Sequence, residues 1–296
     1  MAALNYAKIY SKALAQAFPY VLNFGALYNS PNNTLYRITG AKTIEIPVIS
    51  TTGRVDSDRD TIGAAARNFN NSWETKVLTN QRKWGTLVHP ADIDQTNQAA
   101  SISNITRVYN EEQKFPEMDA YLISKLYADW VASGKVADAT ALTVDNVLTV
   151  FDSLMEGMTD TMVPANGRLL YVTAAVATLI KNAKAIVRNV DAKSGGTVLN
   201  RVVSAIDEVE IVQVPSALMK TLYNFTVGWA PGVGAKQINM CLVHPLAVLT
   251  PVNYQFATLD APSAKTEGKF LYFEESFEDV FILNNKAKAI AFNITV

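Results

Sequence analysis

The segment DIDQTNQAASISNITRVYNEEQKFPEMDAYLISKLYADWVAS (residues 92–133) decides the fold. Asp92 or Asp94 offers a side-chain oxygen to the free amides of a helix start. Pro116 suits the first position of a second helical segment, and Gly134 suits its end. The sequence therefore predicts a long, interrupted helix of roughly forty residues, well beyond the mean length of helices in globular proteins.

The first 43 residues contain no acidic side chain and read as an arm. Ala-rich spacing over residues 3–18 predicts one helix, which Pro19 ends. The arm is too short to bury its own aromatic side chains, so we expect it to lie on another surface. These aromatics are Tyr6, Tyr10, Phe18, Tyr20, Phe24 and Tyr28.

Two strand-like stretches follow the arm. TIEIPVIS (residues 43–50) alternates apolar and polar side chains, and SWETKVLTNQRKWGTLVHP (residues 72–90) is similar. Pro47 has no amide hydrogen to donate, which indicates a strand with a free edge. Two strands joined by a long charged loop predict an extended hairpin with little core of its own, as is common where a neighbouring molecule receives it.

The chain after the long helix alternates short helices and strands, which predicts a layered α+β or α/β arrangement. A helix carrying Val147 and Phe151 precedes a buried strand at residues 168–173 and a helix to residue 185; further strands are expected at residues 210–215 and 239–243. The end of the chain has two strand-like runs, residues 269–283 and 287–294. The residues between them have turn chemistry and predict a hairpin with its tip at Asn284, Asn285 and Lys286.

Composition excludes several classes of protein. With 296 residues, of which 49% are hydrophobic and 18% charged, the chain is long enough for a sizeable core and is neither disordered nor membrane-spanning. The low charged fraction hints that other subunits cover part of the surface. A net charge of −1 disfavours a dedicated nucleic-acid-binding protein. The single Cys241 excludes an intramolecular disulfide and reads as a small buried hydrophobe. We see no signal peptide.

No constellation supports catalysis, a cofactor or a metal. His89 and His244, the only histidines, both precede proline, and we expect structural roles for them. GWAPGVG (residues 228–234) lacks the Lys-Ser/Thr of a phosphate-binding loop. Asp56, Asp58 and Asp60 lack the glycine and the terminal glutamate of a calcium loop. The second acidic cluster comprises Glu274, Glu275, Glu278 and Asp279.

DIDQTN at residues 92–97, followed by PEMDAYLISKLY at residues 116–127, resembles the major capsid proteins of tailed bacteriophages with the Hong Kong 97-type fold. The order of parts continues downstream in GRLLYVTAAVATLIKNA (residues 167–183), AIDEVEIVQVPSALM (residues 205–219) and HPLAV (residues 244–248). The resemblance spans essentially the whole chain, and the order of the motifs is more specific than any one of them.

This resemblance implies an α+β capsid fold in five parts. They are an N-terminal arm (1–43), an extended E-loop hairpin (44–91), a spine helix with a peripheral domain (92–140), an axial domain (141–250) and a return to the peripheral domain with a closing hairpin (251–296). It also implies that arm and E-loop lie across neighbouring subunits, through Tyr6, Tyr10, Arg54, Asp56, Asp58, Arg59, Trp73, Lys76, Lys83 and Trp84. One relative joins an E-loop lysine to a neighbour's Asn with help from a Glu that this hairpin tip lacks, so we expect no such cross-link.

The resemblance further implies a non-enzymatic shell subunit without cofactors. Copies would assemble as pentamers and hexamers into an icosahedral shell around double-stranded DNA, in the host bacterial cytoplasm. Expected partners are a separate scaffolding protein, a portal protein, decoration proteins and, non-specifically, the packaged DNA, with no membrane. The alternative of the same fold is an encapsulin-type nanocompartment, which an apolar groove for a peptide on its inner surface would favour. A small-molecule enzyme would require a deep pocket with paired titratable groups.

Overall fold

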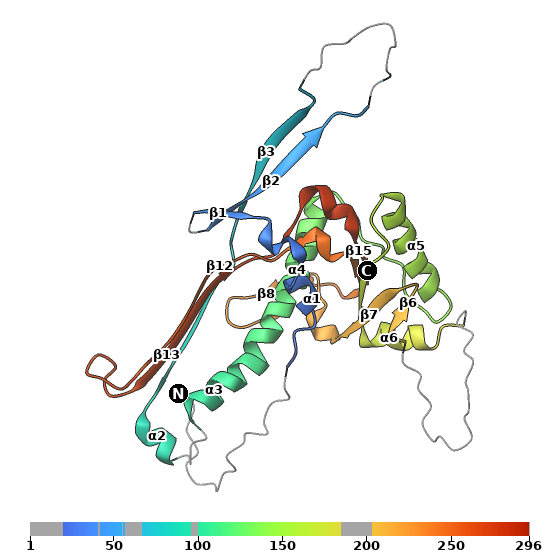
Figure 1. The fold of residues 1–296 in the computed structure, drawn as a ribbon. Helices are drawn as coiled ribbons and strands as arrows, with labels where there is room; N and C mark the ends of the chain where they lie inside the picture. Colours follow the sequence, from blue (N-terminus) through green and yellow to red (C-terminus); the bar gives the residue numbers. More distant parts are fainter. Residues whose placement is uncertain are drawn as a thin grey trace, which may run out of the picture.

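Figure 1 shows the chain as a computed structural model, in which two groups of long strands project from a central body of sheet and helices. The structure describes residues 20–40, 42–54, 56, 67–95, 100–184 and 203–295. The helix predicted for residues 3–18 lies outside these residues.

A five-stranded sheet forms the centre of the body, in the order β15-β10-β5-β7-β6. β5 runs parallel to β7, and the other neighbours are antiparallel. All five residues of β5 are buried, because helices cover both faces of this sheet. The strands are β5 (Leu169–Thr173), β6 (Ala205–Ile206), β7 (Val209–Val214), β10 (Ile238–Val243) and β15 (Ile290–Ile294).

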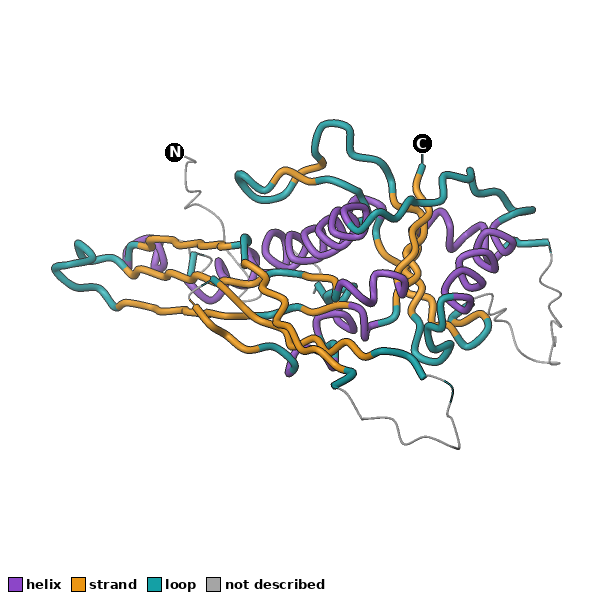
Figure 2. Tube along the Cα trace, turned by 90° about the horizontal axis from the view of Figure 1, so that it is seen from above, coloured by secondary structure: helices purple, strands orange, loops and turns teal. Residues whose placement is uncertain are grey.

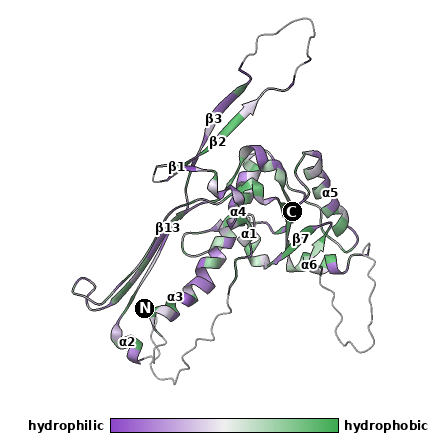
Figure 3. Ribbon diagram, in the orientation of Figure 1, coloured by the Kyte–Doolittle hydropathy of each residue, from purple (hydrophilic) through white to green (hydrophobic). Residues whose placement is uncertain are grey.

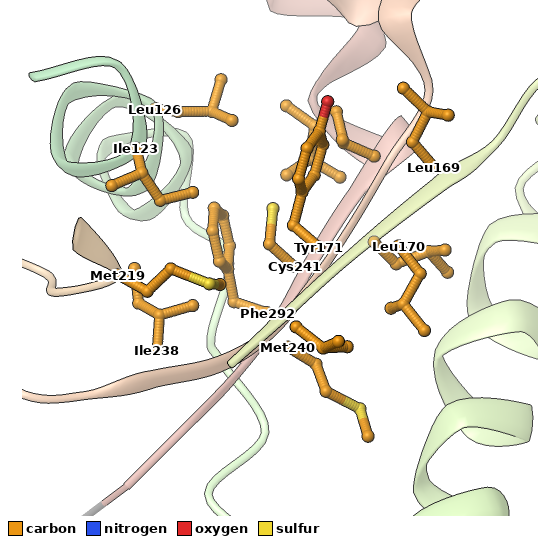
Figure 4. Close-up of a cluster of buried hydrophobic side chains, with 14 of the residues drawn as sticks. Ile123, Leu126, Leu169, Leu170, Tyr171, Met219, Ile238, Met240, Cys241 and Phe292 are labelled. Atoms are coloured by element: carbon orange, nitrogen blue, oxygen red, sulfur yellow. The ribbon is translucent and has the colours of Figure 1, made fainter. Parts of the chain in front are cut away.

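Side chains of the central sheet point alternately to two layers of helices. Tyr171, Cys241 and Phe292 share one register line and point toward Ile123 and Leu126 of the long helix, as Figure 4 shows. Leu170 and Met240 point to the other side, where helices α5 (Val147–Asp160) and α6 (Ala174–Lys181) pack. Cys241 is fully buried, as predicted.

The long helix runs through α3 (Ile102–Tyr109), a π-helical turn (Asn110–Lys114) and α4 (Phe115–Ala132) without a stop. Pro116 lies in the first turn of α4, as predicted for the start of the second segment, and the π turn before it accommodates the missing amide hydrogen. Gly134, at φ +82°, follows the helix end as predicted.

The start of the helix differs from the prediction. Asp92 and Asp94 lie inside a separate short helix, α2 (Pro90–Gln95), so they are not its N-caps. The Oγ of Ser101 takes that place and accepts from the amide of Asn104 at 3.4 Å.

The hairpin sheet, our name for β1-β2-β3, is the first projection. β2 (Thr43–Thr51) and β3 (Phe69–Val77) pair antiparallel, as the sequence predicted. β1 (Arg37–Gly40) covers the other edge of β2 only as far as Glu45, so this edge is uncovered by β1 at Pro47.

The flanking sheet, our name for β12-β13-β4, is the second projection, and Figure 2 shows its strands running together away from the body. It comprises β12 (Val252–Asp260), β13 (Phe270–Glu278) and β4 (Gln81–Val88). The stretch at residues 72–90, predicted as one strand of the hairpin, is therefore two strands in two different sheets.

The division has a physical cause at Leu78 and Thr79. Leu78 is 2% exposed and packs with Ile44 and Phe281 in a small second core. The Asp279 carboxylate accepts from the Thr79 amide at 2.7 Å and from its hydroxyl at 3.0 Å. These contacts turn the chain out of the hairpin sheet and into the flanking sheet.

The prediction of a closing hairpin at residues 269–294 is wrong. β13 pairs with β12 and β4, whereas β15 pairs with β10 in the central sheet. A 3₁₀ turn (Asn284–Ala289) holds the three residues predicted as a tip. The last strand thus belongs with the segment assigned to the axial domain, because its apolar residues complete the central core.

The remaining elements are short. They are α1 (Gly25–Tyr28), β8 (Tyr223–Asn224), β9 (Ala230–Pro231), β11 (Val248–Leu249), β14 (Phe281–Ile282) and 3₁₀ turns at Pro31–Thr34, Ser216–Leu218 and Pro245–Ala247. The glycine-rich stretch at residues 228–234 lies around β9.

Candidate assembly surfaces

One face of the hairpin sheet carries a row of exposed apolar side chains among polar ones. Cross-strand pairs share a face, so Thr51 and Phe69, Ile49 and Asn71, and Pro47 and Trp73 lie in line. We call Pro47, Ile49, Phe69, Trp73 and Val77 the hairpin strip. Four of them are between 51% and 69% exposed, and Pro47 is also exposed. An uncovered apolar face of this kind marks a binding surface or an aggregation hazard.

The opposite face of the same strands holds the hairpin to the body. Ile44 is fully buried and Ile46 is 6% exposed, in the second core with Leu249 and Leu283. Glu74 and Lys76 of β3 lie on this face directly opposite Ile46 and Ile44, and they form an ion pair at 2.6 Å. The hairpin is therefore anchored at its base on one side, while the hairpin strip on the other side has no described cover.

The flanking sheet also has an exposed apolar face, which we call the aromatic strip. Tyr254 and Phe256 of β12 are each 43% exposed, and Leu87 of β4 is 57% exposed. Tyr254 lies 5.7 Å from Phe277, and Phe256 lies 6.4 Å from Phe273, between ring centroids. Figure 3 shows hydrophobic colour along both projections.

The other face of the flanking sheet packs on the long helix. The Trp84 ring stacks on Tyr109 with centroids 3.9 Å apart. Lys114 pairs with Glu274 at 3.0 Å, and the Arg82 guanidinium pairs with Glu117 at 2.5 Å. Trp84, which we expected on the hairpin, is instead half-buried inside its own subunit. Lys83 belongs to the same strand and is exposed, with Glu275 opposite it on the outer face.

A groove of about 640 Å³ opens where this sheet, the π turn and the loop at residues 226–228 meet. Burial raises the pKa of the Glu278 carboxyl on its wall, and the nearby Lys114 opposes the shift. Asp279 in the same acidic cluster accepts from the Tyr121 hydroxyl at 2.7 Å. The ion pair of Glu274 with Lys114 and the hydrogen bond from Tyr121 to Asp279 thus hold the long helix to these carboxylates.

The aromatic side chains at residues 20–28 pack on their own chain, contrary to the prediction that a neighbour buries them. Phe24 is fully buried, 4.7 Å from the ring of Tyr171. The Asp119 carboxylate of α4, also fully buried, accepts from the Tyr20 hydroxyl at 2.6 Å and from the Asn23 amide at 2.9 Å. Burial raises the pKa of Asp119, and these hydrogen bonds oppose the rise.

The histidines have structural surroundings. His244 is 7% exposed; its Nδ1 accepts from the Leu246 amide at 3.2 Å, and its Nε2 lies 3.2 Å from the carbonyl of Asn166. The Nδ1 of His89 accepts from the Ala91 amide at 3.1 Å. The described residues hold no group of three or more His, Cys, Asp or Glu suited to a metal. Among the described residues, no helix is long and apolar enough to cross a membrane.

The predicted interface residues separate into groups. Trp73 and Lys76 lie on opposite faces of β3, and Arg54 and Asp56 are exposed beyond the end of β2. Asn285 is exposed and Lys286 is half-buried; both lie on the 3₁₀ turn and do not form the predicted hairpin tip. Tyr6, Tyr10, Asp58 and Arg59 lie outside the described residues.

Sequence reasoning missed the aromatic strip and the role of Arg168. Alternation along residues 252–259 was available as a signal for the strip. Arg168 is 1% exposed and donates to the carbonyls of Met155 and Val163, which ends α5 with a buried cation. No local pattern indicates that this arginine turns inward.

Comparison with known proteins identifies the fold. Neither a family model nor a curated protein matches the sequence. Among solved structures, the mature capsid of bacteriophage PhiM1 is similar with a TM-score of 0.65 and 14% identity, covering 98% of this chain and 91% of that chain. The capsid of cyanophage P-SCSP1u gives 0.63 and 10%, covering 98% and 93%. The capsid of Myoviridae phage XM1 gives 0.58 and 10%, covering 99% and 96%. The chain has the fold of these phage capsid proteins, as the resemblance in its sequence predicted.

Proposed function

We propose that this chain is the major capsid protein of a tailed bacteriophage. Copies of it assemble as pentamers and hexamers into an icosahedral shell that encloses double-stranded DNA. The role is structural and requires no catalytic centre. The observation that carries the proposal is the similarity to phage capsid structures over nearly the whole chain, with no large part of either chain left unmatched.

The exposed surfaces support this role. The hairpin strip and the aromatic strip are apolar faces on thin sheets that project from the body. Exposing such faces to water does not stabilise a monomer, whereas a shell subunit buries them against neighbours. The net charge of −1 agrees with a shell that confines DNA without binding it tightly.

The proposal includes the expected partners and place of assembly. A scaffolding protein, a portal protein and decoration proteins would complete the head in the cytoplasm of the host bacterium. Arg54, Asp56, Trp73 and Lys76 of the hairpin, with Tyr6, Tyr10, Asp58 and Arg59, are proposed as subunit contacts. Lys83 stays a candidate contact because it is exposed on the outer face of the flanking sheet.

The test is to express the protein alone and together with its genomic neighbours, and to examine both preparations by negative-stain electron microscopy and light scattering. Regular shells or capsomer rings are expected. Shells filled with an enzyme in place of DNA would identify an encapsulin-type nanocompartment. A stable monomer under both conditions would contradict the proposal.

A further inference from the structure

Each projecting sheet has one protected edge and one unprotected edge. Proteins protect an exposed edge strand by keeping it short or by placing lysine, proline or other charges on it. In the hairpin sheet the β1 edge is only four residues long. In the flanking sheet the β4 edge carries Arg82 and Lys83. The opposite edges, β3 and β12, lack such protection over most of their length.

β12 is the least protected strand. From Val252 to Leu259 it has the sequence VNYQFATL, without charge or proline. It pairs with β13 on one side and, among the described residues, with no strand on the other. Tyr254, Phe256 and Leu259 are each more than 40% exposed. Such an edge presents a row of backbone donors and acceptors that a further strand can satisfy.

β3 has matching properties. It is nine residues long, like β12, and is the outer strand of the hairpin sheet. Its outer part, Phe69 to Trp73, reads FNNSW and is also uncharged. Two uncharged edges of equal length are compatible without bringing like charges together.

The two edges cannot meet within one chain. The sheets start side by side, where the Nδ2 of Asn253 donates to the carbonyl of Gly40 at 3.2 Å. From there β3 and β12 run away from each other, as Figure 1 shows. A pairing between them must therefore join two molecules.

We propose that β3 of one subunit pairs edge to edge with β12 of a second copy of this chain. The pairing extends the flanking sheet by the strands of the neighbour's hairpin sheet. The pairing is heterologous, because each subunit offers β3 to one neighbour and β12 to another, and where the rotation closes its repetition generates a ring. This inference rests on the proposed shell function and adds which strand receives the hairpin and by what contact.

The experiment uses thiol cross-linking in assembled particles. Cys241 is the chain's single cysteine and is fully buried, so introduced cysteines are the reactive ones. Asn71→Cys on β3 and Ala257→Cys on β12 both change exposed residues. The two variants are co-expressed as separate chains and treated with a short bismaleimide, which bridges neighbouring strands without requiring one register. Val233→Cys, at a fully exposed residue outside both sheets, is the matched control partner.

The expected result is a covalent dimer from the mixture of Asn71→Cys and Ala257→Cys, with loss of that band when either is paired with Val233→Cys. One chain carrying both substitutions should give a ladder of higher multimers. Dimers from Ala257→Cys alone would show β12 pairing with itself and would overturn the proposal. Intact shells without the mixed dimer would overturn it too, while leaving the capsid function standing; absence of any shell from the unmodified chain would instead contradict the function.

Discussion

The central body and the two projecting sheets use apolar residues in opposite ways. In the body, strands β5, β10 and β15 of the central sheet are buried over most of their length, and residues such as Leu170, Tyr171 and Leu242 are fully covered. In the projections, apolar residues at the same spacing of two remain exposed, for example Ile49, Trp73 and Phe256. The body is stable through contacts within one chain, whereas the projections need contacts with other chains to cover their surfaces.

The largest expected effect comes from the hairpin strip. Ile49→Ser combined with Trp73→Ser should abolish assembly, because both side chains lose apolar area that a neighbour covers. The free energy of unfolding of the subunit should change by at most about 0.5 kcal/mol, since both residues are exposed. Light scattering and urea denaturation measure the two quantities. In the control variant, Ser50 and Asn70, a polar pair on the other face of the same strands, exchange identities. If the test variant loses unfolding free energy as well as assembly, the contrast between the two regions does not hold.

The same truncation in the two regions sharpens the contrast. Leu170→Ala should lower the free energy of unfolding by about 2–5 kcal/mol, because it leaves a cavity in the central core. Leu87→Ala, on the outer face of the flanking sheet, should cost about 0.5 kcal/mol or less. Chemical denaturation of both variants decides the matter, and similar costs would mean that Leu87 is covered in the subunit.

The contact between residues 20–28 and Asp119 of α4 belongs to the body. Asp119→Ala leaves the Tyr20 hydroxyl and the Asn23 amide without their buried acceptor, which should cost about 1–3 kcal/mol of unfolding free energy. Asp129→Ala on the same helix removes only a partly exposed ion pair with Lys125 and should cost about 1 kcal/mol or less. If the two variants unfold at the same denaturant concentration, the buried carboxylate does not fasten this segment.

Substitutions at Trp84 and Lys83 separate the face of the flanking sheet that is stabilised within the subunit from the face that is left for neighbours. Because its ring stacks on Tyr109, Trp84→Ala should destabilise the isolated subunit by about 1 kcal/mol or more. Lys83→Ala, one residue away on the outer face, should leave the isolated subunit unchanged. Thermal unfolding of subunits kept from assembling is the measurement; an unchanged midpoint for Trp84→Ala would place its contribution between subunits.

The smallest expected effect is a pH dependence at Glu278. Burial raises its pKa, so the folded state binds a proton at a higher pH than the unfolded state does. Stability should therefore rise as the pH falls from above the folded pKa toward the ordinary glutamate value of about 4.3. Asp119, whose pKa is also raised, acts in the same direction. Glu278→Gln should increase stability at neutral pH and flatten this slope, as denaturation between pH 4 and 7 can show; an unchanged slope would indicate that Glu278 is solvated.

The sequence predicted those elements whose signals are local. The helix end at Gly134, the hairpin of β2 with β3 and the buried strand β5 follow from residue chemistry within a few positions. Its failures involve distant partners. Nothing near residue 80 shows that Asp279 will bind Thr79 and divide one strand-like stretch between two sheets. Likewise, Asn284 and Asn285 do form a turn, but β15 buries more apolar surface beside β10 than it would beside β13. The hairpin face could be predicted from alternation, whereas the burial of Trp84 required the position of Tyr109.

We infer that the body is complete in one chain and that neighbours complete the projections. Hydrogen exchange, measured by mass spectrometry on free subunits and on assembled particles, distinguishes the two regions. Protection at β3 (Phe69–Val77) and β12 (Val252–Asp260) should rise on assembly, while protection at β5 (Leu169–Thr173) is already high in the subunit and stays so. Equal exchange of β3 and β12 in the two states would contradict the claim.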